Sequence, residues 1–344
     1  MAENTTSAPQ ILPETDASPS NPSSDPSTEE QNPPVEHSTQ ITEDTDISTL
    51  SAAQVYELNQ NLLDLTSDVQ RPLIAEIAPI DELRAEYENG SPYFVQQINY
   101  LQSQGYSSIR RTRGDGECFY RCEYLCPVIF AQHTMTWLAV AFAYVENLLH
   151  ASDPVFAVVA ALSTLEATPK LLESVGFERM VFEDFYEVLI ELVKNVIAPD
   201  VSGSTLTDVA LLEKFQNPEE SNSIVVYLRM LTSAQIRLDP DNFAPFLFHP
   251  ELGEPMEIRE FCEHFVDAAG KEADHVQMTA LSRILRINVD VAYLDGRGSS
   301  GQVDFVKFQP EETSGAAASS PISLLYRPGH YDILVGPRRQ TAEL

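Results

Sequence analysis

Two short stretches, GDGECFYR at residues 114–121 and RPGHYD at residues 327–332, decide which fold and chemistry the chain is expected to have. The first stretch places Cys118 after a glycine turn, at the start of an apolar-rich segment that is predicted to be a helix. A cysteine is a nucleophile only as a thiolate, which a helix N-terminus or a nearby imidazole favours. The glycines also allow a tight turn whose backbone N–H groups could hold an oxyanion. The first stretch therefore predicts a thiol nucleophile.

The second stretch supplies a base and a group that orients it. Pro328-Gly329 is a turn signal between two apolar runs, so His330 and Asp332 are predicted to lie at the start of a strand. Side chains two residues apart on a strand share a face. We therefore expect Asp332 to accept the Nδ1–H of His330, which leaves Nε2 for the thiol. Either stretch alone is weak, because a lone cysteine or histidine commonly has a structural role, but the pair is far more specific.

With both motifs, the chain resembles the otubain branch of the ovarian-tumour (OTU) cysteine proteases, whose motifs are close to Gly-Asp-Gly-Asn-Cys-Phe-Tyr-Arg and Tyr-Arg-Pro-Gly-His-Tyr-Asp. The resemblance continues through VVYLRMLTS at residues 225–233, EFC at residues 260–262 and EADHV at residues 272–276. It covers residues 51–336. It implies a papain-like OTU fold of the α+β class, in which helices flank a mostly antiparallel sheet.

The resemblance also implies the activity and its residues. Cys118 would attack the carbonyl of the terminal glycine of ubiquitin, where it is joined to a substrate lysine. His330 would activate the thiol and then protonate the departing amine. Asp332 would orient His330, and Asp115 would shape the oxyanion loop. No cofactor is needed, and the implied partners are ubiquitin and polyubiquitin. Glu117 stands where the family has asparagine, which would oppose thiolate formation only if its carboxylate faced the site.

A second departure from the family pattern is larger. In otubains the nucleophile helix continues at once as Ala/Ser-x-Gly/Ala-Phe-x-x-x-Glu, whose counterpart here is residues 139–146, so that residues 122–138 are 17 extra residues. They are expected to push residues 139–146 away from the positions that support Cys118. We predict that they are translated from an unspliced intron, because residues 122–124 can be encoded as TGT-GAG-TAT, which contains a donor signal, and residues 138–139 can be encoded as CTA-GCN, which contains an acceptor. Splicing would keep the frame and join Arg121 to a serine.

Other interpretations of this region remain open. The extra residues could be a genuine insertion that is looped out or packed as an extra helix. The uncharged run at residues 124–145 is long enough to span a membrane, but it contains Pro127 and several polar residues, and no close Lys or Arg sets a topology. Cys118, Cys122, Cys126 and His133 could align as metal ligands, but zinc sites favour more closely spaced cysteine pairs. We therefore expect neither insertion into a membrane nor binding of a metal ion.

Composition limits the partners and the compartment. Lys and Arg number 21 against 52 Asp and Glu, a net charge of −31, which repels nucleic acid and anionic lipid and attracts basic partners. Four cysteines are too few for a disulfide scaffold. The N-terminus also lacks the basic and apolar regions of a secretory signal. We therefore expect a reducing cytoplasmic or nuclear setting and no nucleic-acid partner. We also expect a monomer.

The chain is predicted to have four parts. Residues 1–46 are rich in Pro, Ser, Thr and acidic residues, and are predicted to be a disordered acidic tail. Residues 47–106 are predicted to be an N-terminal helical extension, residues 107–336 the catalytic domain, and residues 337–344 a C-terminal tail. Apolar residues from Leu50 to Asp68 recur at helical spacing. This helix either packs on the domain or, as the resemblance implies, docks a second ubiquitin or a ubiquitin-conjugating enzyme.

Periodicity predicts the remaining elements. Helices are predicted at residues 80–88, 93–103, 154–167, 182–196, 206–215, 222–233 and 273–285. Strands are predicted at residues 288–294, 303–308, 322–326 and 331–335. In this sequence most helices precede the strands, an order that is typical of the α+β class. Two functions remain compatible with all of this: an active deubiquitinase, or a catalytically impaired module that binds ubiquitin or a conjugating enzyme through the same surfaces. Labelling of Cys118 by an electrophilic ubiquitin probe separates them.

Overall fold

The computed structural model describes residues 72–113, 135–201, 203–297, 301–310, 320–328 and 330–336. Some of the predicted features lie outside these residues. They are the acidic tail, the helix from Leu50 to Asp68, Asp115, Cys118, the proposed Cys/His metal ligands, residues 122–134 and the C-terminal tail.

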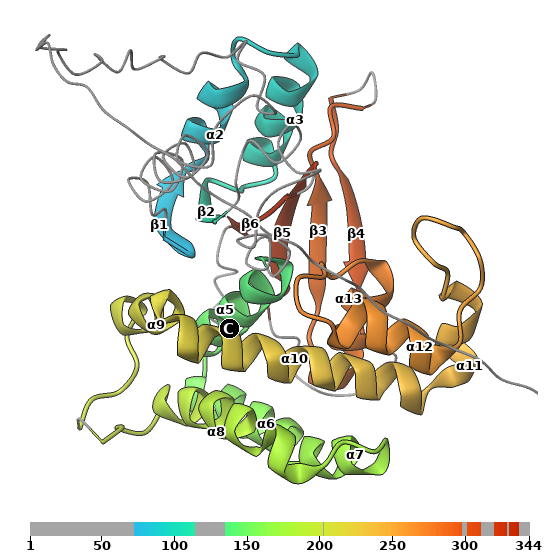
Figure 1. Cartoon of the computed structure of the whole chain (residues 1–344). Helices are drawn as coiled ribbons and strands as arrows, with labels where there is room; N and C mark the ends of the chain where they lie inside the picture. The colour runs from blue at the N-terminus through green and yellow to red at the C-terminus, as the bar shows by residue number, and fades with distance from the viewer. Residues whose placement is uncertain are drawn as a thin grey trace, which may run out of the picture. The chain divides into compact units, whose positions relative to one another are not determined.

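A six-stranded sheet with the order β1-β2-β6-β5-β3-β4 forms the centre of the fold (Figure 1). Its strands are β1 Ile74–Pro79, β2 Ser108–Thr112, β3 Val289–Tyr293, β4 Asp304–Phe308, β5 Ile322–Arg327 and β6 His330–Val335. Neighbouring strands are antiparallel except β3 and β5, which run parallel. The predicted α+β class with a mostly antiparallel sheet is confirmed, as are the four late strands.

Each helix predicted within the described residues is present, with shifted ends. The helices are α2 Ile80–Tyr87, α3 Pro92–Ser103, α5 Met135–Leu149, α6 Pro154–Leu165, α7 Thr168–Ser174, α8 Arg179–Asn195, α9 Asp208–Gln216, α10 Pro218–Leu238, α11 Pro240–Phe243, α12 Ile258–Cys262 and α13 His275–Leu285, with a 3-10 turn at Ala244–Phe246 and a π turn at Glu263–Asp267. Side-chain caps explain several starts: Asp153 caps α6, Thr207 caps α9, and Asp274 forms a capping box on α13.

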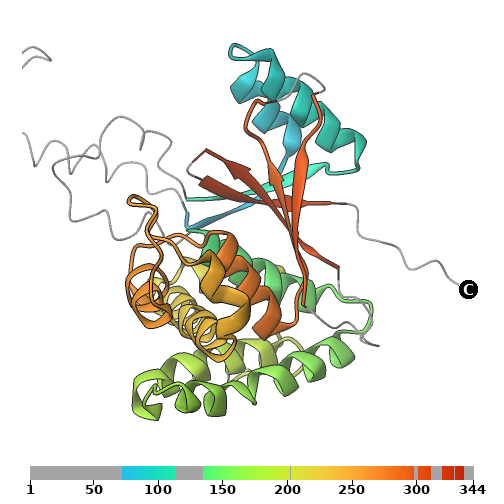
Figure 2. The ribbon, with the colours of Figure 1, turned by 90° about the vertical axis from the view of Figure 1, so that its right-hand side faces the viewer.

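Helices cover both faces of the sheet, and the two cores alternate along each central strand. Helices α2 and α3 lie on one face and the other helices lie on the opposite face (Figure 2). Leu325 and Leu334 belong to the smaller core under α2 and α3, whereas their neighbours Leu324 and Ile333 belong to the larger core. This is the period of two expected of a strand that is buried on both faces.

The boundary predicted at residue 106 does not divide the structure. Strand β1 pairs with β2, and α2 and α3 pack on the same sheet. All of the described residues fall within one compact unit. The described part of the predicted extension is therefore an edge strand and a helical layer of the catalytic domain.

Helix α5 runs through the centre of the larger core. It packs against β5, β6, α9 and α10, and nearly all of its residues as far as Val145 are buried. Residues 139–146 lie within this helix. The prediction that they are pushed away from the positions that support Cys118 stays a prediction, because Cys118 lies outside the described residues. The looped-out alternative is wrong for residues 135–138, which form the first turn of α5. The membrane alternative fails for residues 135–145, since they are buried in protein rather than facing lipid.

The buried first turn of α5 makes a stability prediction. The Trp137 side chain is fully buried, its Nε1–H donates to the carbonyl of Lys271 at 3.1 Å, and the Arg229 guanidinium lies 5.1 Å from its ring centroid. Trp137→Ala is expected to lower the free energy of unfolding by about 3–5 kcal/mol. The control is Met180→Ala, at a side chain that is 81% exposed, which should change it by less than about 0.5 kcal/mol. If denaturant unfolding gave the same change in free energy for Trp137→Ala and Met180→Ala, the first turn of α5 would not be packed in the core.

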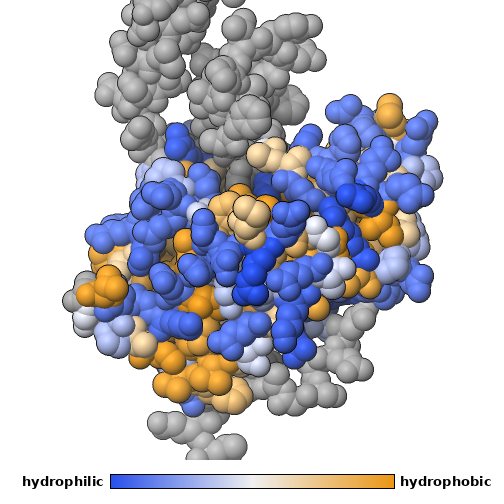
Figure 3. Space-filling model, turned by 60° about the horizontal axis from the view of Figure 1, so that its bottom comes forward, coloured by the Kyte–Doolittle hydropathy of each residue, from blue (hydrophilic) through white to orange (hydrophobic). Residues whose placement is uncertain are grey.

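The surface of the helical layer has an apolar area. Val155, Phe156 and Val159 of α6 and Met180 and Val181 of α8 are exposed, and apolar side chains gather at the lower edge of the face in Figure 3. Among the described residues, only residues 154–174 are long and apolar enough to cross a membrane by length and composition. That segment is broken between α6 and α7, and α6 packs on α5 and α8, which is how helices of a protein core also behave.

Candidate active site

A histidine–carboxylate pair, His330 and Asp332, lies at the start of β6, as predicted. The β5–β6 hairpin pairs Arg327 with His330, so both lie next to the turn that joins the strands. His330 and Asp332 point to the same side of β6, and His330 Nε2 lies 2.9 Å from Asp332 Oδ1. The His330 side chain is 14% exposed and the Asp332 side chain is fully buried. The imidazole can therefore reach a reacting group while its carboxylate partner is shielded from water.

The nitrogen that faces the carboxylate differs from the prediction. We expected Nδ1 of His330 to bind Asp332, but it is Nε2 that does so. Nε2 also lies 3.5 Å from the hydroxyl of Thr112 at the end of β2. The spacing of two residues determines which face the side chains share but not the rotation of the ring. Nδ1 is consequently the nitrogen that remains for a thiol.

Asp332 is held ionised by a cluster of donors. Its Oδ1 accepts the backbone N–H of Thr112 at 3.0 Å, and its Oδ2 lies 2.7 Å from Arg327 Nη2 and 3.8 Å from Arg111 Nη1. Burial alone would raise the pKa of the Asp332 carboxyl. The hydrogen bond from His330 and the positive charges of Arg327, His330 and Arg111 outweigh burial, so that this pKa is lowered. A buried negative charge thus faces the imidazole.

The two arginines are themselves held by an acidic side chain of α2. Glu86 lies 2.5 Å from Arg111 Nη2 and 3.5 Å from Arg327 Nη1. The pKa of Arg327 is raised although burial opposes the charged form, because Asp332 and Glu86 favour it, as does Tyr87. Sequence reasoning missed Arg111, Thr112 and Glu86, and it gave Arg327 no role. Arg327 lies within the RPGHYD motif, so the motif itself was the signal that could have found it.

Helix α5 packs against β6, the strand that carries His330 and Asp332. Thr136 donates its hydroxyl hydrogen to the Glu272 carboxylate. Burial raises the pKa of the Tyr331 hydroxyl. Tyr331 and Met135 belong to the same buried cluster.

Cys262 is the cysteine that the described residues contain, and it is not suited to be a nucleophile. Its side chain is fully buried, and its thiol donates weakly to the carbonyl of Ser233 at 3.8 Å. Burial raises the pKa of this thiol, which disfavours the thiolate. Cys118, the predicted nucleophile, lies outside the described residues.

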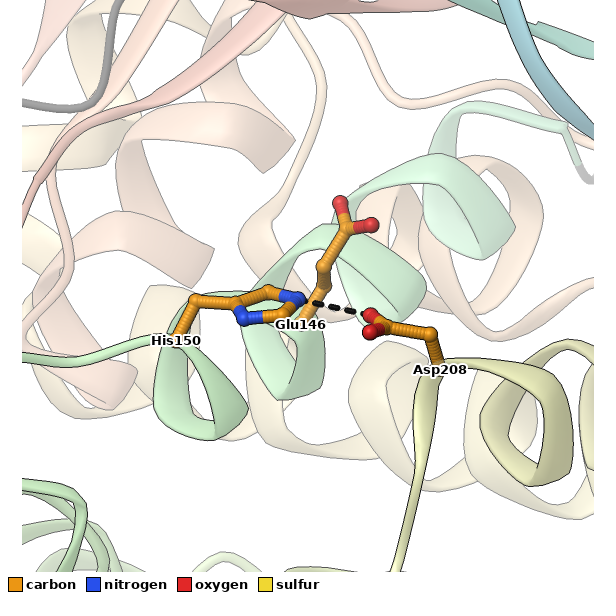
Figure 4. A group of neighbouring side chains, drawn as sticks. All are labelled: Glu146, His150 and Asp208. Carbon is orange, nitrogen blue, oxygen red and sulfur yellow. Dashed lines mark hydrogen bonds and ion pairs between the residues drawn. The ribbon is translucent and has the colours of Figure 1, made fainter.

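A second cluster of titratable groups lies at the other end of α5. Glu146, His150 and Asp208 have oxygen and nitrogen atoms within 4.8 Å of one another, a spacing that could hold a metal ion (Figure 4). Each group already has a protein partner. His150 Nε2 lies 2.6 Å from Asp208 Oδ1, and Glu146 Oε1 accepts from Arg110 at 2.9 Å and 3.2 Å. We assign these groups to joining α5 to α9 and β2.

Comparisons with known proteins agree with the fold and the motifs. A family-wide sequence model described as Peptidase C65 Otubain matches residues 66–129 and 136–336. The protein named OVARIAN TUMOR DOMAIN-containing deubiquitinating enzyme 1, from Arabidopsis thaliana, is 33% identical over 270 residues, covering 76% of this chain and 80% of the relative. Ubiquitin thioesterase OTUB1 from Rattus norvegicus is 34% identical over 269 residues, covering 77% and 84%.

Solved structures give the same answer. The structure described as h/ceOTUB1-ubiquitin aldehyde-UBC13~Ub superposes with a TM-score of 0.62 at 25% sequence identity, and the match covers 84% of this chain and 100% of that chain. The corresponding complex with UBCH5B~Ub also gives a TM-score of 0.62. The helix-flanked sheet, the RPGHYD hairpin and these matches lead to one conclusion. The chain belongs to the peptidase C65 otubain family.

Proposed function

We propose that the chain is a cysteine-dependent deubiquitinase that hydrolyses isopeptide bonds between ubiquitin and lysine side chains and trims polyubiquitin. The relatives are named ubiquitin thioesterases or a deubiquitinating enzyme, and they match about three quarters of the chain. The observation that carries the proposal is the His330–Asp332 pair, in which a buried ionised carboxylate holds a partly exposed imidazole at 2.9 Å. This is the arrangement that a thiol nucleophile requires of its base.

The proposed reaction runs through an acyl-enzyme. The thiolate of Cys118 adds to the carbonyl carbon of the terminal glycine, and backbone N–H groups of the loop around Asp115 hold the resulting oxyanion. The imidazolium of His330 then donates its proton to the leaving lysine amine, which departs with the electrons of the broken C–N bond. Water, deprotonated by the neutral imidazole, cleaves the thioester and releases ubiquitin. Asp332 stabilises the imidazolium and keeps it oriented throughout.

We propose ubiquitin and a ubiquitin-conjugating enzyme as partners. Two matching structures contain ubiquitin aldehyde together with UBC13~Ub or UBCH5B~Ub, and the net charge of −31 favours basic surfaces on a partner. The helix from Leu50 to Asp68 is the proposed contact for the conjugating enzyme. A reducing compartment, the cytoplasm and also the nucleus, would keep the thiol available.

Isopeptide-linked di-ubiquitin tests the activity. We expect the protein, prepared both as the full chain and as a shortened chain that lacks residues 122–138 and carries Ala139→Ser, to release monomeric ubiquitin in at least one of the two forms. The control is the shortened chain with His330→Ala, in which cleavage should be lost because the thiol has no base. If both forms are folded and bind ubiquitin but neither cleaves di-ubiquitin, the chain is a binding module and the proposed activity is wrong.

The binding module is the second candidate, and one observation favours it for the full chain. The helix expected to follow the nucleophile directly has Met135–Leu138 as its first turn instead.

A further inference from the structure

We propose that Thr112, at the end of β2, is a positioning residue for the His330 imidazole: its hydroxyl oxygen, together with the Asp332 carboxylate, holds the ring with a hydrogen on Nε2 and the lone pair on Nδ1. The consequence for catalysis rests on the proposed deubiquitinase activity. The state of the ring does not, because it belongs to the protein at rest and can be measured without substrate.

The first step is the direction of the Thr112 hydroxyl. It donates its hydrogen to the backbone carbonyl of Tyr331, and a carbonyl oxygen can only accept. The hydroxyl oxygen therefore keeps lone pairs for other donors. It lies 3.5 Å from His330 Nε2, which is long for a hydrogen bond, as contacts at catalytic groups often are before substrate binds. Thr112 thus offers an acceptor, and not a donor, to this nitrogen.

The second step is the position of the hydrogen on the imidazole. A neutral imidazole carries one hydrogen, on either Nδ1 or Nε2. His330 Nε2 faces two acceptors, the hydroxyl oxygen of Thr112 and Oδ1 of Asp332 at 2.9 Å. A hydrogen on Nε2 satisfies both acceptors, whereas a hydrogen on Nδ1 would leave three lone pairs facing one another. The favoured tautomer is therefore the one in which Nδ1 is free to take a proton from a thiol.

The third step is that Thr112 orients the Asp332 carboxylate as well. Its backbone N–H donates to Asp332 Oδ1 at 3.0 Å, and the same oxygen binds His330. The antiparallel pairing of β2 with β6 brings Thr112 to this place. One residue of β2 therefore binds three successive residues of β6, which are His330, Tyr331 and Asp332. The imidazole and its carboxylate are positioned relative to each other by a common partner.

The fourth step is the rigidity of this partner. Thr112 is 5% exposed and Asp332 is fully buried, so water has little access to compete for their hydrogen bonds. On the other side of β2, Thr112 pairs with Ile74 of β1, and the Arg113 N–H donates to the carbonyl of Leu73 at 2.9 Å. The end of β2 is thus held from both sides, and the sheet sets the position of the Thr112 hydroxyl.

Thr112→Val tests the inference, because it keeps the shape of the side chain and the backbone N–H but removes the hydroxyl. It is made in whichever form of the chain, full or shortened, cleaves di-ubiquitin faster. We expect kcat to fall about tenfold, the scale of one hydrogen bond to a group that becomes charged in the reaction. KM should stay within twofold, because a buried side chain does not touch ubiquitin. Thr112→Ser, which keeps the hydroxyl, should retain a kcat within threefold of the parent.

Thr232→Val is the matched control for this change. The Thr232 side chain is fully buried, and its hydroxyl also donates to a backbone carbonyl, that of Leu228 at 2.8 Å within α10. The control removes the same atoms from the protein core but leaves His330 with both acceptors, so kcat and KM should not change. An equal fall in kcat for Thr232→Val and Thr112→Val would show a general effect on structure and would overturn the inference.

Nuclear magnetic resonance of protein labelled with nitrogen-15 histidine observes the ring directly and needs no activity. Loss of signals in His330→Ala identifies those of His330. At a pH where the imidazole is neutral, the parent should carry its hydrogen on Nε2. In Thr112→Val that hydrogen should exchange with water at least about tenfold faster, because one of its two hydrogen bonds is lost and the ring can pivot about the other.

Three results would overturn the inference: a hydrogen on Nδ1 in the parent, equal exchange rates in the parent and Thr112→Val, or a kcat for Thr112→Val within threefold of the parent. Failure of Thr112→Ser to retain kcat would also contradict it, since that variant keeps the hydroxyl. If the exchange rate responds as expected but no form of the chain cleaves di-ubiquitin, the inference about the ring stands and the proposed activity is wrong.

Discussion

Cys118→Ala in the shortened chain is expected to abolish cleavage of di-ubiquitin, a loss on the order of 10⁶-fold for removal of a covalent nucleophile. Ubiquitin binding should be retained, because the substrate is held by a surface far larger than one thiol. The assay is steady-state cleavage together with binding measured by calorimetry.

Cys262→Ala is the matched control for this change. The Cys262 thiol is fully buried and hydrogen-bonded, and its pKa is raised by burial. Its removal should therefore leave the cleavage rate unchanged. Residual turnover above background in Cys118→Ala would show that another residue is the nucleophile.

Asp332→Ala is expected to lower kcat by about two to four orders of magnitude, on the analogy of orienting carboxylates in other triads. The Asp332 carboxylate is hydrogen-bonded to His330 and to the backbone N–H of Thr112 and forms an ion pair with Arg327, so its loss frees the imidazole to rotate. Because Asp332 does not contact ubiquitin in the proposed reaction, KM should change little. A general loss of structure would change both constants. A kcat within threefold of the parent would show that another group orients His330.

The same substitution also has a stability effect, since it leaves Arg327 without its buried partner. Removing one member of a buried ion pair costs about 3–5 kcal/mol, and Asp332→Asn, which keeps the volume, should show most of this loss. The direction in which this stabilisation changes with pH follows from the lowered pKa of the Asp332 carboxyl. Its contribution is fully present above the unfolded carboxyl pKa of about 3.9 and is lost as pH falls through the lower folded value. The stability difference between parent and Asp332→Asn should therefore shrink below pH of about 4.

Elements with a clean hydrophobic period were predictable from the sequence, and elements that depend on distant charges were not. Helix α8 and strand β6 follow the helical and strand periods closely. Strand β2 was missed because its sequence, SIRRT, carries two adjacent arginines. Arg110 is buried there in an ion pair with Glu146 of α5, with the two side chains 6% and 14% exposed. The sequence pattern of β2 alone gives no sign of Glu146, because the two are far apart in the chain.

The candidate site was predictable in part for the same reason. The spacing of His330 and Asp332 requires only strand geometry, and it was sufficient to bring the pair together. Thr112 and Arg111 reach Asp332 because β2 pairs with β6, with Arg110 opposite Ile333. Such cross-strand partners depend on sheet register. The position of residues 135–138 was also beyond sequence reasoning, since an apolar turn of Met, Thr, Trp and Leu fits a loop-out, an extra helix or the first turn of α5 equally well.

The most direct test of the central claim is to map the ubiquitin adduct in the shortened chain. Of the four cysteines in the sequence, this form keeps only Cys118 and Cys262. After reaction with the electrophilic probe, intact-mass and peptide mass spectrometry should find one ubiquitin adduct, located on Cys118, and none after His330→Ala. A folded, ubiquitin-binding protein with no adduct, or with the adduct on Cys262, would contradict a Cys118–His330–Asp332 protease.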